Sequence, residues 1–147
     1  MSESGSFNGK THILPIRIYY EDTDVSGVVY HANYLRYMER ARSEFFRKLG
    51  ITKLAQLEQP DPSAWTLTKI DLEYRRPARL DDLITVRTRC IALSGARLTV
   101  EQNTYKSEML LVTGRVEACI MALTGRPRRI PEDIYQRLAP YLQETTV

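Results

Sequence analysis

Residues 20–34 hold the side chains with the clearest chemical potential in the chain, in the order Tyr-Glu-Asp-Thr-Asp-Val-Ser-Gly-Val-Val-Tyr-His-Ala-Asn-Tyr. Acidic side chains and a glycine here precede an amphipathic helix. The N–H groups at a helix start have no partner within the helix and can bind a developing oxyanion. A carboxylate held nearby can attack a carbonyl or activate water. The segment therefore suits acyl transfer.

Asp24 is the leading catalytic candidate, because it lies in the loop and can fold back towards the first helical turn near His31. On residue type alone, an aspartate before a helix is more often a turn former or cap, by about three to one. Asp22 is two residues away, so an extended chain directs its side chain oppositely. We expect Asp22 to bond neighbouring backbone or an arginine.

Three further residues of this segment have more than one interpretation. Gly27 allows a sharp turn or a close approach of the backbone to a ligand. The ring of His31 could bind or orient a substrate, its backbone N–H could bind an oxyanion, or it could be an ordinary exposed or packed histidine. Tyr30, like Tyr34 and Tyr37, could line a substrate pocket, although packing is favoured by about two to one.

Charged residues elsewhere offer weaker signals. Arg75 and Arg76 follow a strand and could hold phosphates, although exposed arginines usually form a solvated face. Glu39 and Glu44 could act as a base, but arginines at helical spacing favour surface ion pairs.

The elements that would position these residues follow from periodicity. Alternation predicts a strand over 13–20, and steps of three and four residues predict a helix that ends at Gly50. The apolar stripe of that helix comprises Leu35, Met38, Ala41, Phe45 and Leu49.

Four more strands are indicated after a linker that contains Pro60 and Pro62. They lie near residues 70–74, 84–90, 96–100 and 110–120, with turns at Ser94-Gly95 and at 106–108. A short terminal helix should have Pro131 at its first position. The order predicts an α+β fold in which one long helix covers one face of an antiparallel sheet.

Length and composition limit the function classes. The 147 residues fit one domain, which we place at residues 12–147 after a flexible lead over residues 1–11. A net charge of +3 without a basic run argues against nucleic acid, yet it suits a polyanionic small ligand or an acidic carrier protein.

The two cysteines and two histidines show no disulfide or zinc spacing, so we expect a reducing compartment and no metal. No segment resembles an export signal or a membrane span. A cytoplasmic protein is therefore predicted.

Three motifs carry a family resemblance: Tyr20-Glu-Asp-Thr-Asp-x-x-Gly-Val-Val-Tyr-His-Ala-Asn-Tyr34, Glu39-Arg-Ala-Arg-x-Glu44 and Pro77-Ala-x-Leu-Asp-Asp82. With them the sequence closely resembles the YbgC-like acyl-CoA thioesterases of the 4-hydroxybenzoyl-CoA thioesterase family, from about Ile13 to Ile134. The resemblance implies a hotdog fold, a long central helix wrapped by a five-stranded antiparallel sheet. It also implies homodimers or homotetramers with active sites at subunit interfaces.

The same resemblance implies hydrolysis of an acyl-CoA thioester. The family's catalytic carboxylate falls on Asp24 and its oxyanion-binding backbone N–H on His31, whose side chain matches a histidine of the YbgC branch. Many relatives have two small residues before the glycine, where this chain has Val25-Ser26, so substrate choice is open.

The sequence thus predicts a thioesterase with catalytic Asp24 and His31, and with Gly27, Tyr30, Arg75 and Arg76 binding substrate. No cofactor is expected, since CoA is part of the substrate, and acyl-carrier protein is an alternative carrier. Two other functions stay open. One is a hotdog-fold hydratase or dehydratase acting on enoyl thioesters. The other is a noncatalytic acyl-thioester-binding scaffold that uses the arginine-rich tail against an acidic partner.

Overall fold

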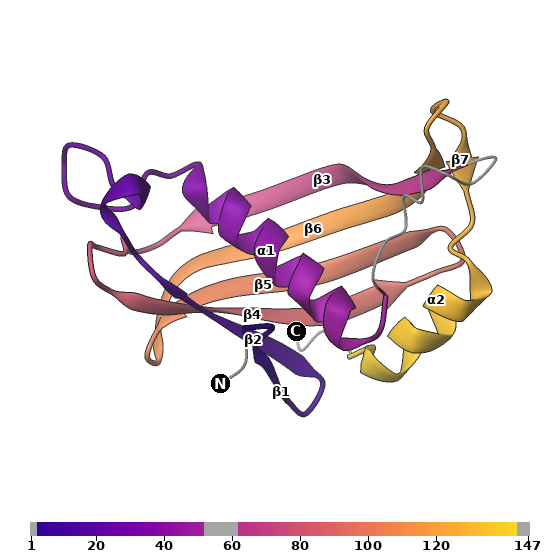
Figure 1. Ribbon diagram of the computed structural model, residues 1–147, viewed down its shortest axis with the longest axis horizontal. Helices are drawn as coiled ribbons and strands as arrows, with labels where there is room; N and C mark the ends of the chain where they lie inside the picture. The colour runs from indigo at the N-terminus through magenta and orange to yellow at the C-terminus, as the bar shows by residue number, and fades with distance from the viewer. Residues whose placement is uncertain (1–2, 52–61, 144–147) are drawn as a thin grey trace.

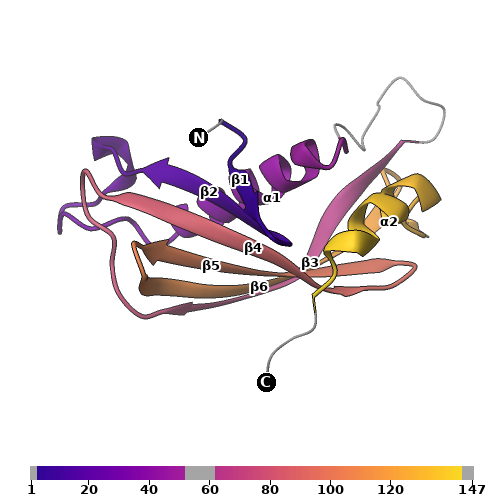
Figure 2. The ribbon, with the colours of Figure 1, turned by 90° about the horizontal axis from the view of Figure 1, so that it is seen from below.

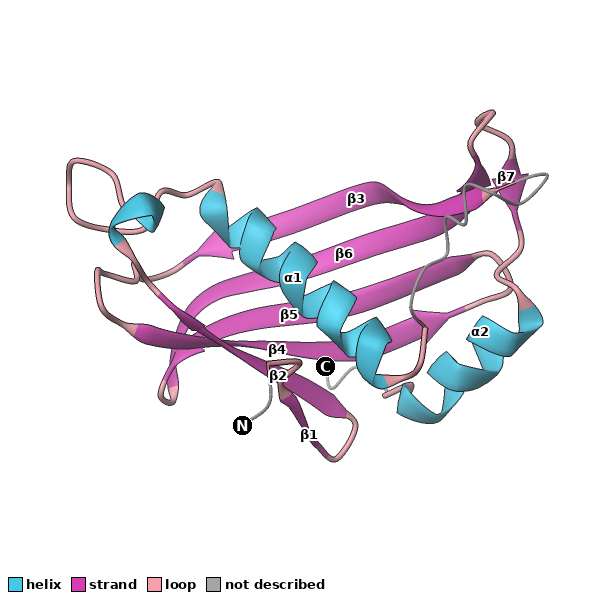
Figure 3. Cartoon of the chain, in the orientation of Figure 1, coloured by secondary structure: helices cyan, strands magenta, loops and turns pink. Residues whose placement is uncertain are grey.

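The computed structural model describes residues 3–51 and 62–143. Helix α1 (Asn33–Lys48) lies across one face of an antiparallel sheet, and the short helix α2 (Glu132–Leu138) lies beyond its C-terminal end (Figures 1 and 3). The view from below shows α1 confined to that one side of the sheet (Figure 2). This is the hotdog arrangement that the resemblance implies. The strands are β1 (Ser6–Asn8), β2 (Thr11–Arg17), β3 (Ser63–Tyr74), β4 (Leu83–Leu93), β5 (Arg97–Lys106), β6 (Met109–Ala122) and β7 (Pro127–Arg128).

The strand order is β1-β2-β4-β5-β6-β3, with β7 paired to β6. Burial alternates along β4, β5 and β6, because every second side chain faces α1. Strand β3 is at the end of this order and pairs with one described strand, β6. Among the described residues, no further strand covers this long edge of the sheet.

The predicted apolar stripe of α1 is confirmed except at its first residue. Met38, Ala41, Phe45 and Leu49 are buried, but Leu35 is 39% exposed. Tyr34 and Tyr37 are buried in its place. The helix is rotated towards these rings because the Tyr34 hydroxyl accepts a hydrogen bond from the Ala78 N–H at 3.0 Å.

Gly114 of β6 lets α1 approach the sheet closely. A Cβ at this position would lie 2.8 Å from both the Gln102 carbonyl oxygen and Met38 Cε. Any side chain here would push the helix away from the sheet, since protein interiors are close-packed. The glycine thus fixes the height of α1 above its strands.

The predicted flexible lead, residues 1–11, was wrong in its described part. It contains β1, which pairs with β2 in register from Ser6 opposite Ile13 to Asn8 opposite Thr11. Phe7 anchors this strand, because its ring packs against Phe45 and Tyr141. The ordered domain thus begins before residue 12.

The first predicted strand was too long and the strand count too low. Strand β2 ends at Arg17, and Tyr20–Asp22 forms a 3₁₀ turn instead of continuing it. The chain bends there because the Asp22 carboxylate accepts a hydrogen bond from the Tyr19 N–H at 2.8 Å. Within the described residues the sheet has seven strands instead of five, since β1 and β7 are too short to show a period in the sequence.

Other predictions agree with the structure. The turns at Ser94-Gly95 and at 106–108 separate the strands as expected. Pro131 immediately precedes α2, whereas the prediction made it the first residue of that helix. The linker at Pro60 lies outside the described residues. Among the described helices, none is both long and apolar enough to span a bilayer.

Candidate active site

The acidic loop is a tight hairpin. Thr23 and Val29 form a β-bridge, the Asp24 N–H donates to the Val28 carbonyl at 3.1 Å, and the Gly27 N–H donates to the Asp24 carbonyl at 3.0 Å. Gly27 has φ +82°, and a Cβ there would meet nothing within 4 Å. Backbone conformation, not space, therefore requires glycine at this position.

The Asp24 carboxylate stabilises this turn. Its Oδ1 accepts hydrogen bonds from the Ser26 N–H at 2.8 Å and from the Ser26 hydroxyl. These bonds, and to a smaller degree the nearby His31, lower the pKa of Asp24. Asp24 is therefore a turn former, as its residue type favours. It is also an exposed, ionised carboxylate whose Oδ2 accepts no hydrogen bond from the described residues.

Asp22 has the structural role that the sequence predicted, since its carboxylate bonds the Tyr19 backbone. Its carbonyl oxygen accepts hydrogen bonds from the Tyr30 N–H at 3.0 Å and from Asn33 Nδ2 at 2.8 Å. Asn33 is the first residue of α1. Asp22 therefore ties the acidic loop to the start of the helix.

The start of α1 leaves backbone donors unused. The Asn33 and Leu35 amides donate to the carbonyls of Tyr30 and Ala32. In the described part of the chain, the amides of His31, Ala32 and Tyr34 donate to no partner. An oxyanion placed here would therefore find free N–H groups at the positive end of the helix.

His31 is held mainly through its backbone. Its carbonyl accepts a hydrogen bond from the Tyr74 hydroxyl at 2.9 Å. Its ring is exposed and lies 4.5 Å, centroid to centroid, from the ring of Tyr30. Among the described residues no carboxylate bonds the imidazole, so the ring lacks the partner that orients a typical catalytic histidine.

The segment 77–82 packs against both the loop and the helix. The Ala78 N–H donates to the Tyr34 hydroxyl, and the Ala78 carbonyl accepts from the Val29 N–H at 2.9 Å. Ala78 itself is fully buried. Asp82 closes the segment by accepting from the Arg79 N–H at 2.8 Å and pairing with Lys106 at 2.9 Å.

A surface hollow of ≈ 320 Å³ lies beside the helix start. It brings three predicted site residues together, His31, Arg75 and Arg76. Asp24, Gly27 and Tyr30 do not line it and lie in the adjoining loop. The lining residues are Val29, His31, Tyr34, Tyr74, Arg75, Arg76 and Pro77.

The two arginines have weak partners of their own. Arg75 lies 3.4 Å from the Glu73 carboxylate, and Arg76 Nη1 donates to Met109 Sδ at 3.6 Å. Both side chains are exposed. Exposed guanidinium groups with weak partners can bind a phosphate without first breaking a strong ion pair.

Sequence reasoning missed Tyr74 and Ala78. Tyr74 positions the His31 carbonyl, and burial raises the pKa of its hydroxyl. Its place directly before Arg75 was the available signal. The role of Ala78 depends on contacts with residues far along the chain, which no local pattern contains.

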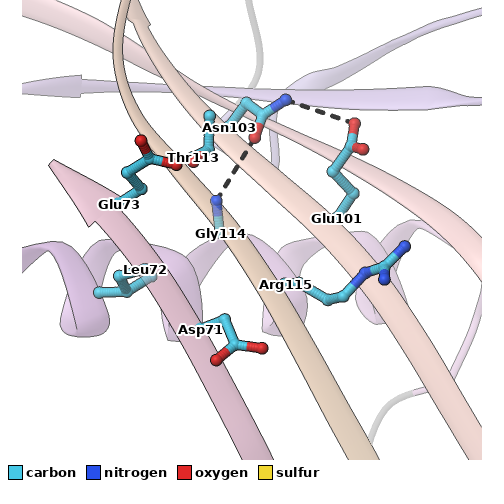
Figure 4. A pocket seen from close by; sticks show the side chains of 8 residues that line it. All are labelled: Asp71, Leu72, Glu73, Glu101, Asn103, Thr113, Gly114 and Arg115. Carbon is cyan, nitrogen blue, oxygen red and sulfur yellow. Dashed lines mark hydrogen bonds between the residues drawn. The ribbon is translucent and has the colours of Figure 1, made fainter. Parts of the chain in front are cut away.

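A second hollow, of ≈ 340 Å³, lies on the sheet face turned away from α1 (Figure 4). Its wall holds the carboxylates of Asp71, Glu73 and Glu101, and Asn103 bonds Glu101 at 3.3 Å. It contains no helix start, and its carboxylates would repel a polyanion. The described residues contain no group of three or more His, Cys, Asp and Glu that could hold a metal ion.

Known proteins show the same combination of loop, helix and sheet. The family model described as "Thioesterase-like superfamily" matches residues 19–138. The chain is 37% identical to "Acyl-CoA thioesterase YbgC" of Haemophilus influenzae over 122 residues, which cover 82% of this chain and 89% of that protein. It is 36% identical to "Acyl-CoA thioester hydrolase YbgC" of Escherichia coli over 122 residues, 82% of this chain and 90% of that protein.

A solved structure agrees with these matches. The crystal structure of "Probable Thioesterase" from Bartonella henselae has a TM-score of 0.78 and 41% sequence identity. The match covers 82% of this chain and 99% of that one. The family match spans the acidic loop, the start of α1 and the segment 77–82, so every part of the candidate site lies within it.

Proposed function

The chain belongs to the thioesterase-like superfamily and is a thioester hydrolase, and we propose that it hydrolyses an acyl-CoA to a carboxylic acid and free CoA. The observation that carries this proposal is the pairing of unused amides at the start of α1 with the ionised Asp24 in the loop tied to it. In this proposal the thioester carbonyl lies at the His31 N–H. One oxyanion donor is typically worth about 10²- to 10³-fold in rate.

Asp24 has two possible roles in the proposed reaction. As a base, it takes a proton from water, hydroxide adds to the carbonyl carbon, and the intermediate expels the CoA thiolate, which recovers the proton. As a nucleophile, Asp24 attacks the carbonyl carbon, expels the thiolate and forms an anhydride that water then opens. The free Oδ2 suits either role.

A single turnover in ¹⁸O water tests for the nucleophile route. If water opens the anhydride at the Asp24 carbonyl, ¹⁸O remains in the enzyme, where mass spectrometry of the peptide containing Asp24 detects it. Labelled peptide therefore establishes the nucleophile route. Unlabelled peptide together with labelled acid is the result of the base route or of an anhydride that water opens at the acyl carbonyl.

The other predicted site residues have roles in substrate binding. We propose that Arg75 and Arg76 bind CoA phosphates at the rim of the hollow, where their exposed guanidiniums lack strong partners. Gly27 holds the hairpin that carries Asp24. Tyr30 supports the His31 ring, and that ring assists substrate binding only.

A second copy of the chain completes the proposed site. No described strand covers the outer edge of β3, which exposes Leu67 and Tyr74, at 41% and 48%, and such edges pair readily with another strand. The exposed Asp24 also needs a cover that excludes water before it can act efficiently. We therefore propose a homodimer through β3, alone or as half of a homotetramer.

The proposed reaction needs only water besides its substrate, so no metal or organic cofactor takes part. The cysteines Cys90 and Cys119 are free. Free thiols fit a reducing compartment, and we place the reaction in the cytoplasm. Whether acyl-carrier protein can replace CoA is a question for the same assay.

A product assay tests the proposal. The purified protein is incubated with short, long and aromatic acyl-CoAs, and with acyl-carrier protein thioesters. Released thiol is measured with a colorimetric thiol reagent. We expect thiol and carboxylic acid in equal amounts. Hydration of an enoyl-CoA without thiol release would establish the hydratase alternative. Tight binding of acyl-CoA without any turnover would establish the noncatalytic scaffold.

A further inference from the structure

A small, partly open cavity lies between the C-terminal half of α1 and the sheet. Its volume is ≈ 40 Å³, and its walls are mainly apolar. They include the rings of Phe45, Phe46 and Trp65, of which Phe46 and Trp65 stack at 5.4 Å and are only partly buried. This space exceeds the roughly 10–15 Å³ that one water molecule needs. The cavity can hold the tip of a small group.

Arg42 brings a charge to this cavity that apolar walls do not explain. Burial lowers the pKa of its guanidinium, and Glu39 acts weakly in the opposite direction. Of its five N–H donors, one is used among the described residues, from Nη1 to Gln102 Oε1 at 2.9 Å. Arg42 is only partly buried, and its remaining donors can bond a ligand that brings an acceptor.

The direction of this donor set is fixed by Gln102. Gln102 is fully buried, and its Nε2 donates to the Met38 carbonyl at 2.9 Å and to Thr88 Oγ1 at 3.0 Å. Its oxygen is thereby presented to Arg42. The cavity residue Trp65 adds a second donor, because its buried indole N–H has no partner in the described part of the chain.

From these contacts we infer, resting on the proposed thioesterase function, that the cavity receives the far end of the acyl group. Arg42 and Trp65 are specificity-determining residues that favour acyl groups ending in a hydrogen-bond acceptor, such as a hydroxyl or a carboxylate. The apolar walls hold the carbon skeleton beside them. An acyl group without a terminal oxygen leaves the buried Trp65 donor unbonded and gains no bond from Arg42, which disfavours it.

The cavity serves the active site of the second copy. Within one chain, Arg42 lies eleven positions after His31, most of them in α1, a distance of about 16 Å at 1.5 Å per residue. If two β3 edges pair antiparallel about the middle of Ser63–Tyr74, Trp65 of one copy lies opposite Leu72 of the other. Leu72 is two residues from Tyr74, which contacts His31. A short acyl group held at one His31 thus reaches the cavity of the other copy.

Matched substrates test the selectivity. Thiol release is measured for hexanoyl-CoA and 6-hydroxyhexanoyl-CoA with wild type, Arg42→Met and Trp65→Phe. Both substitutions remove donors, and they keep an apolar side chain and an aromatic ring, respectively. We expect Arg42→Met to lower kcat/KM for the hydroxylated substrate about tenfold more than for hexanoyl-CoA, and Trp65→Phe to act in the same direction more weakly. The control Arg40→Met, on the exposed side of α1, should leave the ratio at its wild-type value.

The outcomes separate the inference from the function. Equal losses of kcat/KM for both substrates, which leave their ratio unchanged, would overturn the proposed selectivity. Thiol release by the wild type would still support the thioesterase. No thiol from either substrate in wild type would reject both. Thermal unfolding of each variant shows whether an equal loss comes from poor folding. If Arg42→Met folds poorly, Trp65→Phe, which keeps an aromatic ring, decides the outcome through its ratio of kcat/KM for the two substrates.

Mixed dimers test the arrangement across copies. Asp24→Asn and Arg42→Met chains carry different tags, are coexpressed and are purified through both tags. If the cavity serves the other copy, one site in each mixed dimer combines an intact Asp24 with an intact Arg42. The mixed dimer should then show the wild-type substrate ratio. The ratio of the Arg42→Met homodimer would place the cavity in the service of its own chain and contradict the arrangement.

Discussion

The two ends of α1 differ in how their backbone groups are used. At the C-terminal end, the Leu49 carbonyl accepts a hydrogen bond from Arg137 of the α2 segment at 3.0 Å, which places a cation at the negative end of the helix. At the N-terminal end, the amides of His31 and Ala32 donate to no described partner.

This difference indicates a division of roles along one element. The C-terminal end closes the core against β1 and α2, and it stabilises the fold. The N-terminal end keeps its electropositive groups available, which lowers local stability but suits the binding of negative charge. Substitutions at the first end should therefore change stability, and those at the second end should change turnover or substrate affinity.

The largest expected effect on stability is at Leu138, which is fully buried in the cluster around Phe45. Leu138→Ala should lower the free energy of unfolding by about 2–5 kcal/mol through lost burial and a residual cavity. Urea unfolding measures this. Leu123→Ala, at a 56% exposed position, is the control and should change little. A large loss of kcat in correctly folded Leu138→Ala would break the proposed division.

The next largest effect is expected at the two arginines near the N-terminal end of α1. Arg75→Gln with Arg76→Gln should raise KM for acyl-CoA by about 100-fold, because two charge-assisted contacts of about 1.5 kcal/mol each are lost. The folded stability should be retained. Acyl-pantetheine, which lacks the nucleotide phosphates, should show no such rise. Arg115→Gln, on the outer sheet face, is the matched control, and an equal rise there would contradict the assignment.

The smallest expected effect is a pH dependence of stability that arises from His12, whose ring packs against Phe45 near the C-terminal end of α1. His12 is fully buried, its Nε2 lies 2.7 Å from the Ser4 carbonyl oxygen, and burial is the main cause that lowers its pKa. The unfolded chain, with a histidine pKa of about 6.5, then binds a proton more readily than the folded protein. Stability should be full above about pH 6.5 and should fall below it.

Urea midpoints between pH 8 and 5.5 measure this dependence. Glu44 raises the pKa of His12 and Lys48 lowers it, so both charges belong to the same balance. His12→Gln should flatten the curve in this range. An equally steep curve for that variant would assign the dependence to other groups.

Much of the fold could be predicted because it depends on local patterns. The long strands and the body of α1 alternate or repeat over many residues. The strand β1 could not be predicted, because its three residues owe their place to the contacts of Phe7 with Phe45 and Tyr141. The end of β2 was misplaced for a similar reason, since the bond between Asp22 and Tyr19 overrides the β propensity of two tyrosines.

The sequence proposed residues for the candidate site but not their geometry. Asp24, His31, Arg75 and Arg76 were proposed, the first two with the help of the family motif. The bonds that join them, from Tyr74 to His31 and from Ala78 to Tyr34, connect residues more than forty positions apart. The exposure of Leu35 and of the β3 edge also depends on a surface that a single chain leaves open.

The central claim is that the Asp24 carboxylate acts beside the free amides at the start of α1. The most direct test compares kcat of Asp24→Asn with that of Asp71→Asn, which removes an exposed carboxylate from the outer sheet face. The account predicts a loss of about 10²- to 10⁴-fold for Asp24→Asn, wild-type unfolding behaviour for both variants, and near wild-type kcat for Asp71→Asn. Wild-type turnover in folded Asp24→Asn would contradict it.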